Sequence, residues 1–196
     1  AGDLRDVLGI LSRRADKRVH PAWVGRVTAL KREIPASTAM PDAPADPLEV
    51  LRTLRRLLPD DAVVATDVGQ HQMWTAQHFE FRQPRTLLTS GGLGTMGYGL
   101  GAAIGAQAAF PDRRVVLVSG DGSFHMNLNE LTTLASYDLP IVVVVMNNRV
   151  LGMVRQWQKV FYGRRFSATD PHRKTDLVKL AEAFGCTGMR ITAAGE

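Results

Sequence analysis

The chain has 196 residues, of which 45% are hydrophobic and 22% are charged, a composition typical of a soluble globular protein. Its net charge of +5 comes from scattered Arg and Lys, with no basic run between aromatic residues, so we expect no nucleic-acid partner. The longest apolar run, residues 139–146, is too short to span a membrane. The lone Cys186 cannot form an internal disulfide, which excludes a disulfide-stapled secreted fold and favours a cytoplasmic protein.

The first part of the chain predicts two helices and a linker. Residues 3–15 and 22–34 each place apolar side chains on one helical face. Residues 35–47 are rich in Pro, Ala and Ser and show little periodicity, which predicts an interdomain linker. Because two helices bury little surface by themselves, we interpret residues 1–34 as the C-terminal helices of a preceding, middle domain.

From residue 48 to residue 196 helices and strands alternate, which predicts an α/β fold with a doubly wound parallel sheet. The apolar run 139–146 is predicted to be a central strand buried on both faces. The helices are expected near residues 47–58, 70–78, 98–109, 128–134 and 175–184, and the strands near 62–66, 86–89, 114–119, 139–146 and from Gly188.

Two short polar segments follow neighbouring strands of this predicted sheet. They are Gly120-Asp121-Gly122 and, about 25 residues later, Asn147-Asn148. Open α/β sheets bind ligands at the carboxyl ends of their strands, and a carboxylate with an amide oxygen suits Mg²⁺. The backbone N–H groups of Gly122 and Ser123, at a helix start, can meet a diphosphate. This pattern resembles the diphosphate–Mg²⁺ motif of thiamine-diphosphate (ThDP) enzymes.

A competing interpretation rests on the glycines at residues 92–97, which fit G-x-G-x-x-G between a strand and a helix. With Asp121 at the end of the next strand, this matches a dinucleotide-binding fingerprint. However, the glycine run also includes Gly91 and Gly99, and Asp121 begins a second anion-binding turn. We therefore favour one ligand shared by both turns, with a nicotinamide-dependent oxidoreductase as an alternative.

Three stretches make the resemblance more specific: residues 66–74 (TDVGQHQMW), 91–99 and 147–158 (NNRVLGMVRQWQ). They closely resemble the catalytic large subunits of the acetolactate synthase (acetohydroxyacid synthase) family, from about residue 41 onward and more loosely before it. One departure is Gly101, where the family usually has Pro. The resemblance implies ThDP- and Mg²⁺-dependent decarboxylation of pyruvate and its ligation to a second 2-ketoacid, the first common step of branched-chain amino acid biosynthesis.

The resemblance also implies roles for individual residues. Asp121 and Asn148 would ligate Mg²⁺ by side chain and Val150 by its carbonyl. Gly94 would hold the cofactor's 4′-amino group, Met96 would support the bent cofactor, and Met153 and Trp157 would line the substrate side. The residues expected around the cofactor are Gln70, His71, Gly94, Met96, Gly120, Asp121, Gly122, Ser123, Asn148, Val150, Leu151, Gly152 and Met153.

In this family the cofactor site lies between two subunits, so the resemblance implies a homodimer or higher oligomer, FAD in the full-length parent and a possible small regulatory subunit. A Glu from the partner's N-terminal domain acts on the cofactor ring. We therefore expect this chain to be a C-terminal fragment truncated at both ends, inactive alone. Another ThDP-dependent 2-ketoacid decarboxylase or oxidase, and a non-catalytic fragment, remain as alternatives.

Overall fold

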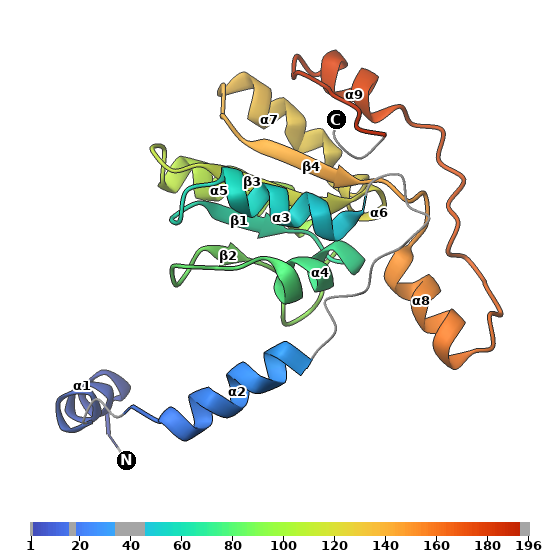
Figure 1. The fold of residues 1–196 in the computed structure, drawn as a ribbon. Coiled ribbons are helices and arrows are strands. Elements are labelled where there is room, and N and C mark those ends of the chain that lie inside the picture. Colours follow the sequence, from blue (N-terminus) through green and yellow to red (C-terminus); the bar gives the residue numbers. More distant parts are fainter. Residues whose placement is uncertain (1, 16–18, 34–45, 193–196) are drawn as a thin grey trace. The chain divides into compact units, whose positions relative to one another are not determined.

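The computed structural model describes residues 2–15, 19–33 and 46–192. The chain divides into two compact units, Ala1–Ala39 and Met40–Glu196, and the predicted linker 35–47 lies outside the described residues except for Asp46 and Pro47. The helices and strands, labelled in Figure 1, are α1 Leu4–Arg14, α2 Pro21–Glu33, α3 Pro47–Leu57, β1 Val63–Thr66, α4 Gln70–His78, β2 Leu87–Leu88, α5 Tyr98–Ala109, β3 Val115–Gly120, α6 Asp121–Phe124, the 3₁₀ turn η1 Leu128–Glu130, α7 Leu131–Ser136, β4 Val142–Met146, α8 Gly152–Phe161 and α9 Leu177–Ala183.

The first unit contains the two predicted helices α1 and α2. The side chain of Asp3 caps α1 by accepting the backbone N–H of Arg5 at 2.9 Å, which satisfies a donor that has no partner inside the helix. The apolar face of α1 is open: Leu4 is 71% exposed and Leu8 is 56% exposed. Both helices are present at the predicted positions, whereas their assignment to a middle domain stays a prediction.

The second unit is built on one parallel sheet in the order β2-β1-β3-β4. The predicted doubly wound parallel sheet is therefore confirmed. From β1 the chain first adds β2 on one side and then returns to add β3 and β4 on the other, so the strand order reverses between β1 and β3. In such sheets the crevice at this reversal, outside the carboxyl ends of the strands, is where ligands bind.

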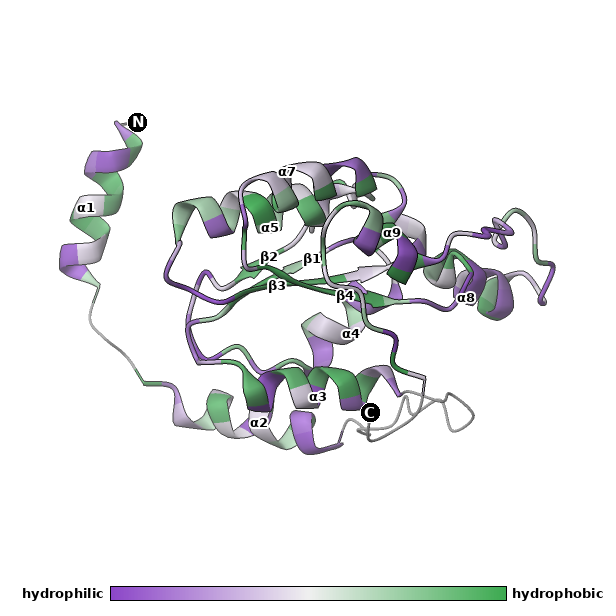
Figure 2. Ribbon diagram, turned by 90° about the horizontal axis from the view of Figure 1, so that it is seen from above, coloured by the Kyte–Doolittle hydropathy of each residue, from purple (hydrophilic) through white to green (hydrophobic). Residues whose placement is uncertain are grey.

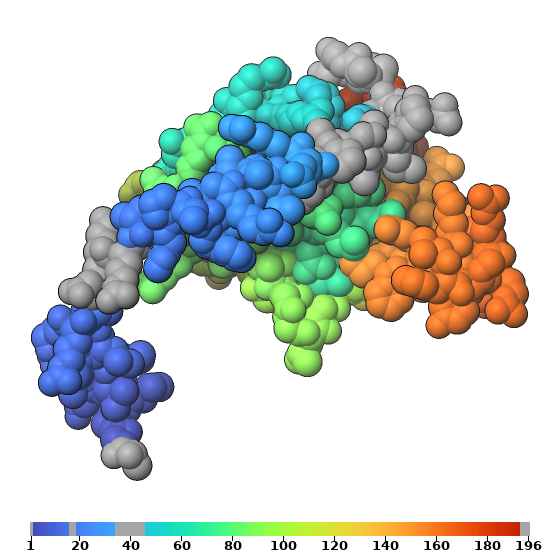
Figure 3. Space-filling view, turned by 60° about the horizontal axis from the view of Figure 1, so that its bottom comes forward, coloured from blue at the N-terminus to red at the C-terminus, as the bar shows by residue number. Residues whose placement is uncertain are grey.

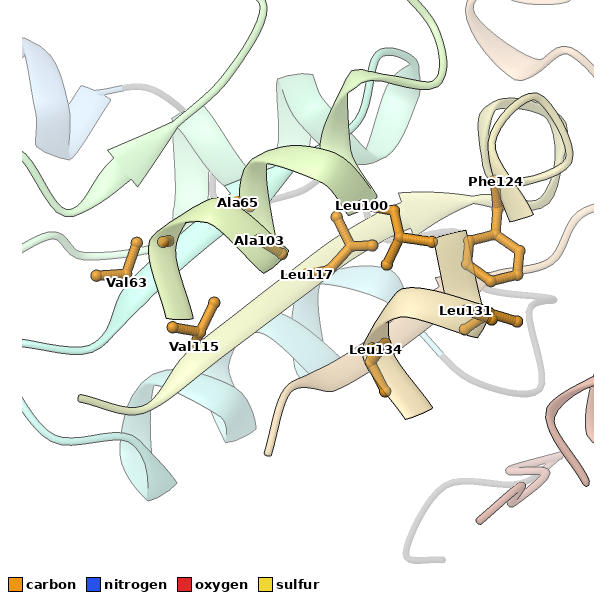
Figure 4. Packing of buried hydrophobic residues seen from close by; sticks show 10 residues of the cluster. Val63, Ala65, Leu100, Ala103, Val115, Leu117, Phe124, Leu131 and Leu134 are labelled. Carbon is orange, nitrogen blue, oxygen red and sulfur yellow. The ribbon is translucent and has the colours of Figure 1, made fainter. Parts of the chain in front are cut away.

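Helices cover both faces of the sheet because its inner strands are apolar on both sides. Figure 2 shows α5 and α7 over one face and α3 and α4 over the other. On the first face Ala65 and Leu117 pack with Leu100 of α5 (Figure 4), while on the second Val64 and Val116 pack with Leu51 of α3. Each fully buried Val or Leu contributes about 1.5–3 kcal/mol, so this packing holds the strand ends in fixed positions.

The prediction for residues 139–146 is partly wrong. A strand forms there, but it is shorter, and in the described part of the chain it lies at the edge of the sheet, paired only with β3. Val142 is 44% exposed and the rest of β4 is half-buried. An unbroken apolar run indicates cover on both faces, and both core clusters do touch β4, but it does not reveal how many strands flank it.

The strand predicted from Gly188 is wrong for the described residues up to Thr192, which contain none. The chain turns at Gly185 and runs back along α9, where a Cβ on Gly188 would lie 2.8 Å from the carbonyl oxygen of Val178. Arg190 donates to Asp176 at 2.9 Å, so residues 188–190 lie along α9 and add no strand to the sheet. The helix predicted over 128–134 is also different, since it divides into η1 and α7.

Candidate functional site

The carboxyl ends of β1 and β3 meet where the strand order reverses, and His71 lies between them. The ring of His71, from the first turn of α4, fits between two glycines. A Cβ on Gly69 would lie 2.7 Å from its Cε1, and a Cβ on Gly120 would lie 2.8 Å from its Nδ1. Glycine at both positions therefore lets the imidazole fill the gap between the two strand ends.

The buried His71 has one unsatisfied nitrogen. The side chain is 4% exposed, and burial lowers its pKa to about 4, although a hydrogen bond to the backbone of Asp67 acts in the opposite direction. The ring is therefore neutral near pH 7. Its Nε2 has no hydrogen-bond partner among the described residues. Since buried polar atoms are nearly always paired, this nitrogen is a point where a polar ligand fits.

Asp121 begins α6 directly after β3 and is 4% exposed. Burial raises the pKa of its carboxyl group, and the guanidinium of Arg173 and the backbone N–H of Asn148 partly counteract this rise. Arg173 Nη1 lies 3.8 Å from Asp121 Oδ2. The ends of β3 and β4, which pair at Gly120 and Met146, thus bring Asp121 and Asn148 into contact.

The loop after β4 connects this turn to helices α4 and α8. Asn148 accepts the backbone N–H of Val150 with its Oδ1 at 3.1 Å and donates to Gln70 Oε1 at 3.5 Å. Gln70 in turn donates to Gln156 Oε1 of α8 at 2.9 Å. A Cβ on Gly152 would collide with Gln70 Oε1, so any other residue where α8 begins would displace the Gln70 side chain.

The glycine-rich turn before α5 brings Met96 to the same place. A Cβ on Gly122 would lie 2.7 Å from Leu151 Cδ2 and 3.8 Å from Met96 Cε, so three loops meet around Gly122. The turn itself depends on two residues in the left-handed region, Gly94 with φ +62° and Gly97 with φ +89°, where glycine has no steric penalty.

Met153 and Trp157, the predicted substrate-side residues of α8, are less buried than Asp121 and His71. Met153 is half-buried, whereas Trp157 is 57% exposed and packs edge-on against Phe161, with ring centroids 6.1 Å apart. Figure 3 shows this part of the chain, coloured orange, standing out from the surface of the second unit. Met96 and Leu151 thus lie close to Gly122, whereas Trp157 is exposed.

The structure adds residues to which the sequence gave no role. The Nδ1 of His125 donates to the backbone oxygen of Asp121 at 2.6 Å, and its Nε2 is hydrogen-bonded to the hydroxyl of Thr175 at 2.9 Å. Arg173 lies in the same segment as Thr175, between α8 and α9. These contacts join residues about 50 positions apart, and no local pattern announces them. Asp67 is different, since it directly follows β1 within the stretch 66–74, a position at which a polar residue is a signal.

A hard cation at Asp121 would need mixed oxygen ligands. In the part of the chain that the structure describes, no three His, Cys, Asp or Glu side chains cluster as a metal site. A cation at Asp121 would therefore draw on amide and backbone oxygens besides the carboxylate, and such donors suit Mg²⁺, which also retains water or phosphate oxygens. The described helices include none long and apolar enough to cross a membrane.

The sheet order weakens the dinucleotide alternative. In that fold the acid that binds the ribose lies at the end of the strand beside the one that precedes the glycine turn. Here the glycine turn follows β2 and Asp121 follows β3, and β1 lies between these two strands. The glycine turn and Asp121 therefore do not have the relation that the fingerprint requires.

With this site described, comparison with known proteins gives the class of the chain. Residues 67–196 match the family described as "Thiamine pyrophosphate enzyme, C-terminal TPP binding domain", and the chain belongs to that family. The matched range contains the whole group of residues from Asp67 to Arg173, including the glycine turn. The turn is therefore part of a thiamine-diphosphate-binding domain.

Curated relatives of the chain are acetolactate synthase large subunits, which confirms the resemblance found in the sequence. The chain is 49% identical over 183 residues to the large subunit of Parasynechococcus marenigrum (strain WH8102), covering 93% of this chain and 29% of that protein. It is 51% identical over 146 residues to the isozyme 3 large subunit of Escherichia coli (strain K12), covering 74% of this chain and 25% of that protein.

A solved structure gives the same fold. The chain superposes on the thiamine diphosphate-dependent 4-hydroxybenzoylformate decarboxylase of Rhodococcus jostii RHA1 with a TM-score of 0.71 and 30% sequence identity, over 78% of this chain and 28% of that chain. The chain spans about a quarter to a third of the length of the curated relatives that it matches.

Proposed function

We propose that this chain forms the diphosphate and metal half of the active site of a ThDP-dependent acetolactate synthase. The observation that carries the proposal is the buried group at the ends of β1 and β3. There the carboxylate of Asp121 meets the backbone of Asn148, and the Nε2 of His71 lies buried without a partner among the described residues. A magnesium ion would pair with the carboxylate of Asp121, and an anionic ligand would pair with the Nε2 of His71.

Mg²⁺ would be held by the side-chain oxygens of Asp121 and Asn148 and by the backbone carbonyl of Val150. The proposal is supported by the compact loop in which Asn148 already bonds the backbone of Val150. The burial that raises the pKa of Asp121 leaves a carboxylate poorly hydrated, and a divalent cation would stabilise its charged form.

The diphosphate would contact Gln70, His71 and the backbone N–H groups of Gly122 and Ser123, with Gly120, Leu151 and Gly152 as the surrounding wall. The first N–H groups of a helix have no partner within it and favour an anion. The ring of His71 already bonds the backbone of Asp67, so an anion at Nε2 favours the doubly protonated ring. We therefore expect proton uptake when the cofactor binds.

The remaining predicted residues would act on the organic part of the cofactor and on the substrate. When bound, ThDP supplies a carbon nucleophile and an electron sink for the loss of CO₂. Gly94 would hold the 4′-amino group, and the thioether of Met96 would support the cofactor without competing for protons. Met153 and Trp157 would line the side where pyruvate and the second 2-ketoacid bind.

Several further parts of the proposal follow from the resemblance to the acetolactate synthase family. They are branched-chain amino acid biosynthesis as the pathway, FAD in the full-length protein, assembly as a homodimer or higher oligomer, and a small regulatory subunit. The proposed cytoplasmic location, the expectation of no nucleic-acid partner and the domain division at residues 1–34, 35–47 and 48–196 follow from composition, charge and sequence pattern.

Cofactor binding by the enzyme assembled with the rest of its subunit tests the metal site. Asp121→Ala removes the charged ligand, and we expect Mg²⁺-dependent ThDP affinity, measured by calorimetry, to fall about 100-fold or more, since even groups behind the ligands contribute 10- to 100-fold. Asp176→Ala is the matched control, because that carboxylate caps α9 by accepting the N–H of Val178 at 3.0 Å and lies outside the site. Unchanged affinity in Asp121→Ala would refute the proposed metal site.

The fold likeness to a ThDP-dependent 2-ketoacid decarboxylase favours a second candidate, decarboxylation without ligation. The two activities differ in product. With pyruvate the synthase releases CO₂ and acetolactate, whereas a decarboxylase releases CO₂ and acetaldehyde. Acetolactate as the main product supports the synthase, and acetaldehyde alone supports the decarboxylase. ThDP binding without turnover of any 2-ketoacid would favour a non-catalytic protein.

A further inference from the structure

Asp67 borders the candidate site, and its carboxylate bonds the glycine turn before α5 and not the proposed metal ligands. It directly follows β1 and is 2% exposed. Its backbone N–H donates to the carbonyl oxygen of Val118 in β3 at 3.0 Å, which continues the sheet by one residue. The main chain of Asp67 is therefore fixed by both strands that border the crevice.

The carboxylate of Asp67 accepts three backbone N–H groups. Its Oδ1 accepts from Val68 at 2.8 Å and from Gly97 at 2.9 Å, and its Oδ2 accepts from Gly99 at 3.1 Å. Because two different oxygens bind two amides of the same turn, they fix the orientation of that turn as well as its distance from β1. Hydrogen bonds to an ionised acceptor are about twice as strong as neutral ones.

The carboxylate also replaces a cap that α5 lacks. The N-cap position of α5 is Gly97, which has no side chain to bond the first amides of the helix. Asp67, 30 positions earlier in the sequence, supplies the acceptors, and a negative charge at a helix N-terminus is favoured by the helix dipole. The start of α5 thus depends on a residue of another element.

The contact is too close for the helix to shift. A Cβ on Gly99 would lie 2.9 Å from the backbone nitrogen of Asp67 and 2.7 Å from Leu117 Cδ1. The first turn of α5 therefore rests directly on the end of β1, and only glycine fits between them. Movement of the glycine turn relative to the strand ends would have to break the bonds to Asp67.

We propose that Asp67 is a positioning residue that sets the place of Met96 and Gly94 relative to the diphosphate turn. Met96 directly precedes Gly97, and its Cε lies 3.8 Å from where a Cβ on Gly122 would be. This inference rests on the proposed function, in which Met96 and Gly94 orient the organic part of the cofactor. Asp67 thereby acts on the alignment of the cofactor and not on its diphosphate anchor.

Asp67→Asn tests the proposal in the assembled enzyme. The variant keeps the shape of the side chain, but its NH₂ group cannot accept a hydrogen bond from the backbone N–H that it faces. Without cofactor, we expect the amides of Gly97 and Gly99 to exchange with deuterated water about tenfold or more faster. With Mg²⁺ and ThDP bound, the C2 proton of the cofactor should exchange about 10- to 100-fold more slowly, as expected for a misplacement near 1 Å. Cofactor affinity should change much less than this.

Asp46→Asn is the matched control, since Asp46 also accepts one backbone N–H, that of Leu48 at 2.9 Å, but at the start of α3. Asp46→Asn should leave the exchange rates of the Gly97 and Gly99 amides and of the cofactor's C2 proton unchanged. If Asp67→Asn does not fold, Asp67→Glu keeps the charge and pushes the turn outward by one methylene, and slow C2 exchange is expected there too.

The outcomes separate this inference from the proposed function. Fast amide exchange with a normal C2 exchange rate would mean that Asp67 is only structural and would overturn the inference. Unchanged amide exchange would overturn it as well. If the unaltered enzyme bound no Mg²⁺–ThDP, the proposed function itself would fail, whereas Asp67→Asn that binds the cofactor but exchanges its C2 proton slowly supports both.

Discussion

The strand-end site and helix α8 differ sharply in burial, although sequence motifs pointed to both. Asp67, His71, Asp121 and Ser123 are each 4% exposed or less. In contrast α8, all of which the structure describes, has no buried residue, and Phe161 is 71% exposed. The first region is held by sheet hydrogen bonds and a packed core, and the second is connected mainly through polar side chains such as the Gln70–Gln156 pair.

This difference separates the two halves of the proposed site. His71, Asp121 and Ser123, assigned to the metal and diphosphate, are buried in the second unit, whereas Gln70 and Gly152 of the same group connect it to α8. The residues assigned to the substrate side, Met153 and Trp157, lie on a helix with little internal support. Stability measurements should therefore respond strongly to changes at the strand ends and weakly to changes in α8.

The largest expected effect is that of Gly99→Ala. The new Cβ would lie 2.9 Å from the backbone of Asp67, and overpacking against backbone costs about 3 kcal/mol. Gly105→Ala in the same helix is the control, because among the described residues no atom lies within 4 Å of its Cβ position; it should stabilise by up to about 1 kcal/mol. Thermal unfolding of the two variants compares them, and equal effects would contradict the close contact.

Acid should weaken the strand-end region through His71. Its pKa is about 4 in the folded protein against 6.5 as the ordinary value, so the unfolded chain takes up a proton first as the pH falls. The contribution is fully present above pH 6.5 and is lost between pH 6.5 and 4, at about 1.4 kcal/mol per pH unit and up to about 3 kcal/mol in total.

His71→Gln removes this titration, so the loss of stability between pH 6.5 and 4 should be smaller in the variant than in the unaltered protein. Unfolding free energies from urea titrations at several pH values measure the difference. An identical pH slope in both proteins would show that His71 is not buried in its neutral form.

A smaller effect is expected where the two regions are joined. Gln156→Ala removes the hydrogen bond between α8 and Gln70 at 2.9 Å, and an exposed hydrogen bond contributes about 1 kcal/mol or less. Deuterium exchange should become faster in α8 while the amides of β1 and β3 keep their rates. Equal acceleration in both regions would mean that they form one cooperative unit.

The smallest effect on stability is expected for Trp157→Ala. The side chain is 57% exposed and its ring contact is with Phe161, so the change should cost no more than about 1 kcal/mol. If Trp157 lines the substrate side as proposed, the same variant should change the ratio of products formed from competing 2-ketoacids. A large loss of thermal stability with an unchanged product ratio would mean that Trp157 supports the fold and does not line the substrate side.

Much of the fold followed from local patterns. The alternation of apolar segments predicted the helices from α3 to α5 and the strands β1 and β3 within one or two residues, because buried strands and amphipathic helices leave their periodicity in the sequence. Among the described residues, the edge position of β4 and the absence of a strand from Gly188 to Thr192 did not follow, since strand neighbours and the path after α9 depend on contacts that local periodicity does not encode.

By itself the sequence determined the parallel α/β fold, the family and the residues of the polar turns, because glycines, Asp121 and the asparagines after β4 lie at strand ends where the chain order alone places ligands. Only the tertiary structure decided how these turns are held together. The bonds from Gly97 and Gly99 to Asp67 and the contacts of Arg173 and His125 join positions far apart in the chain, and they exist only after the sheet and its helices have packed. The same packing buries the Nε2 of His71 without a partner among the described residues.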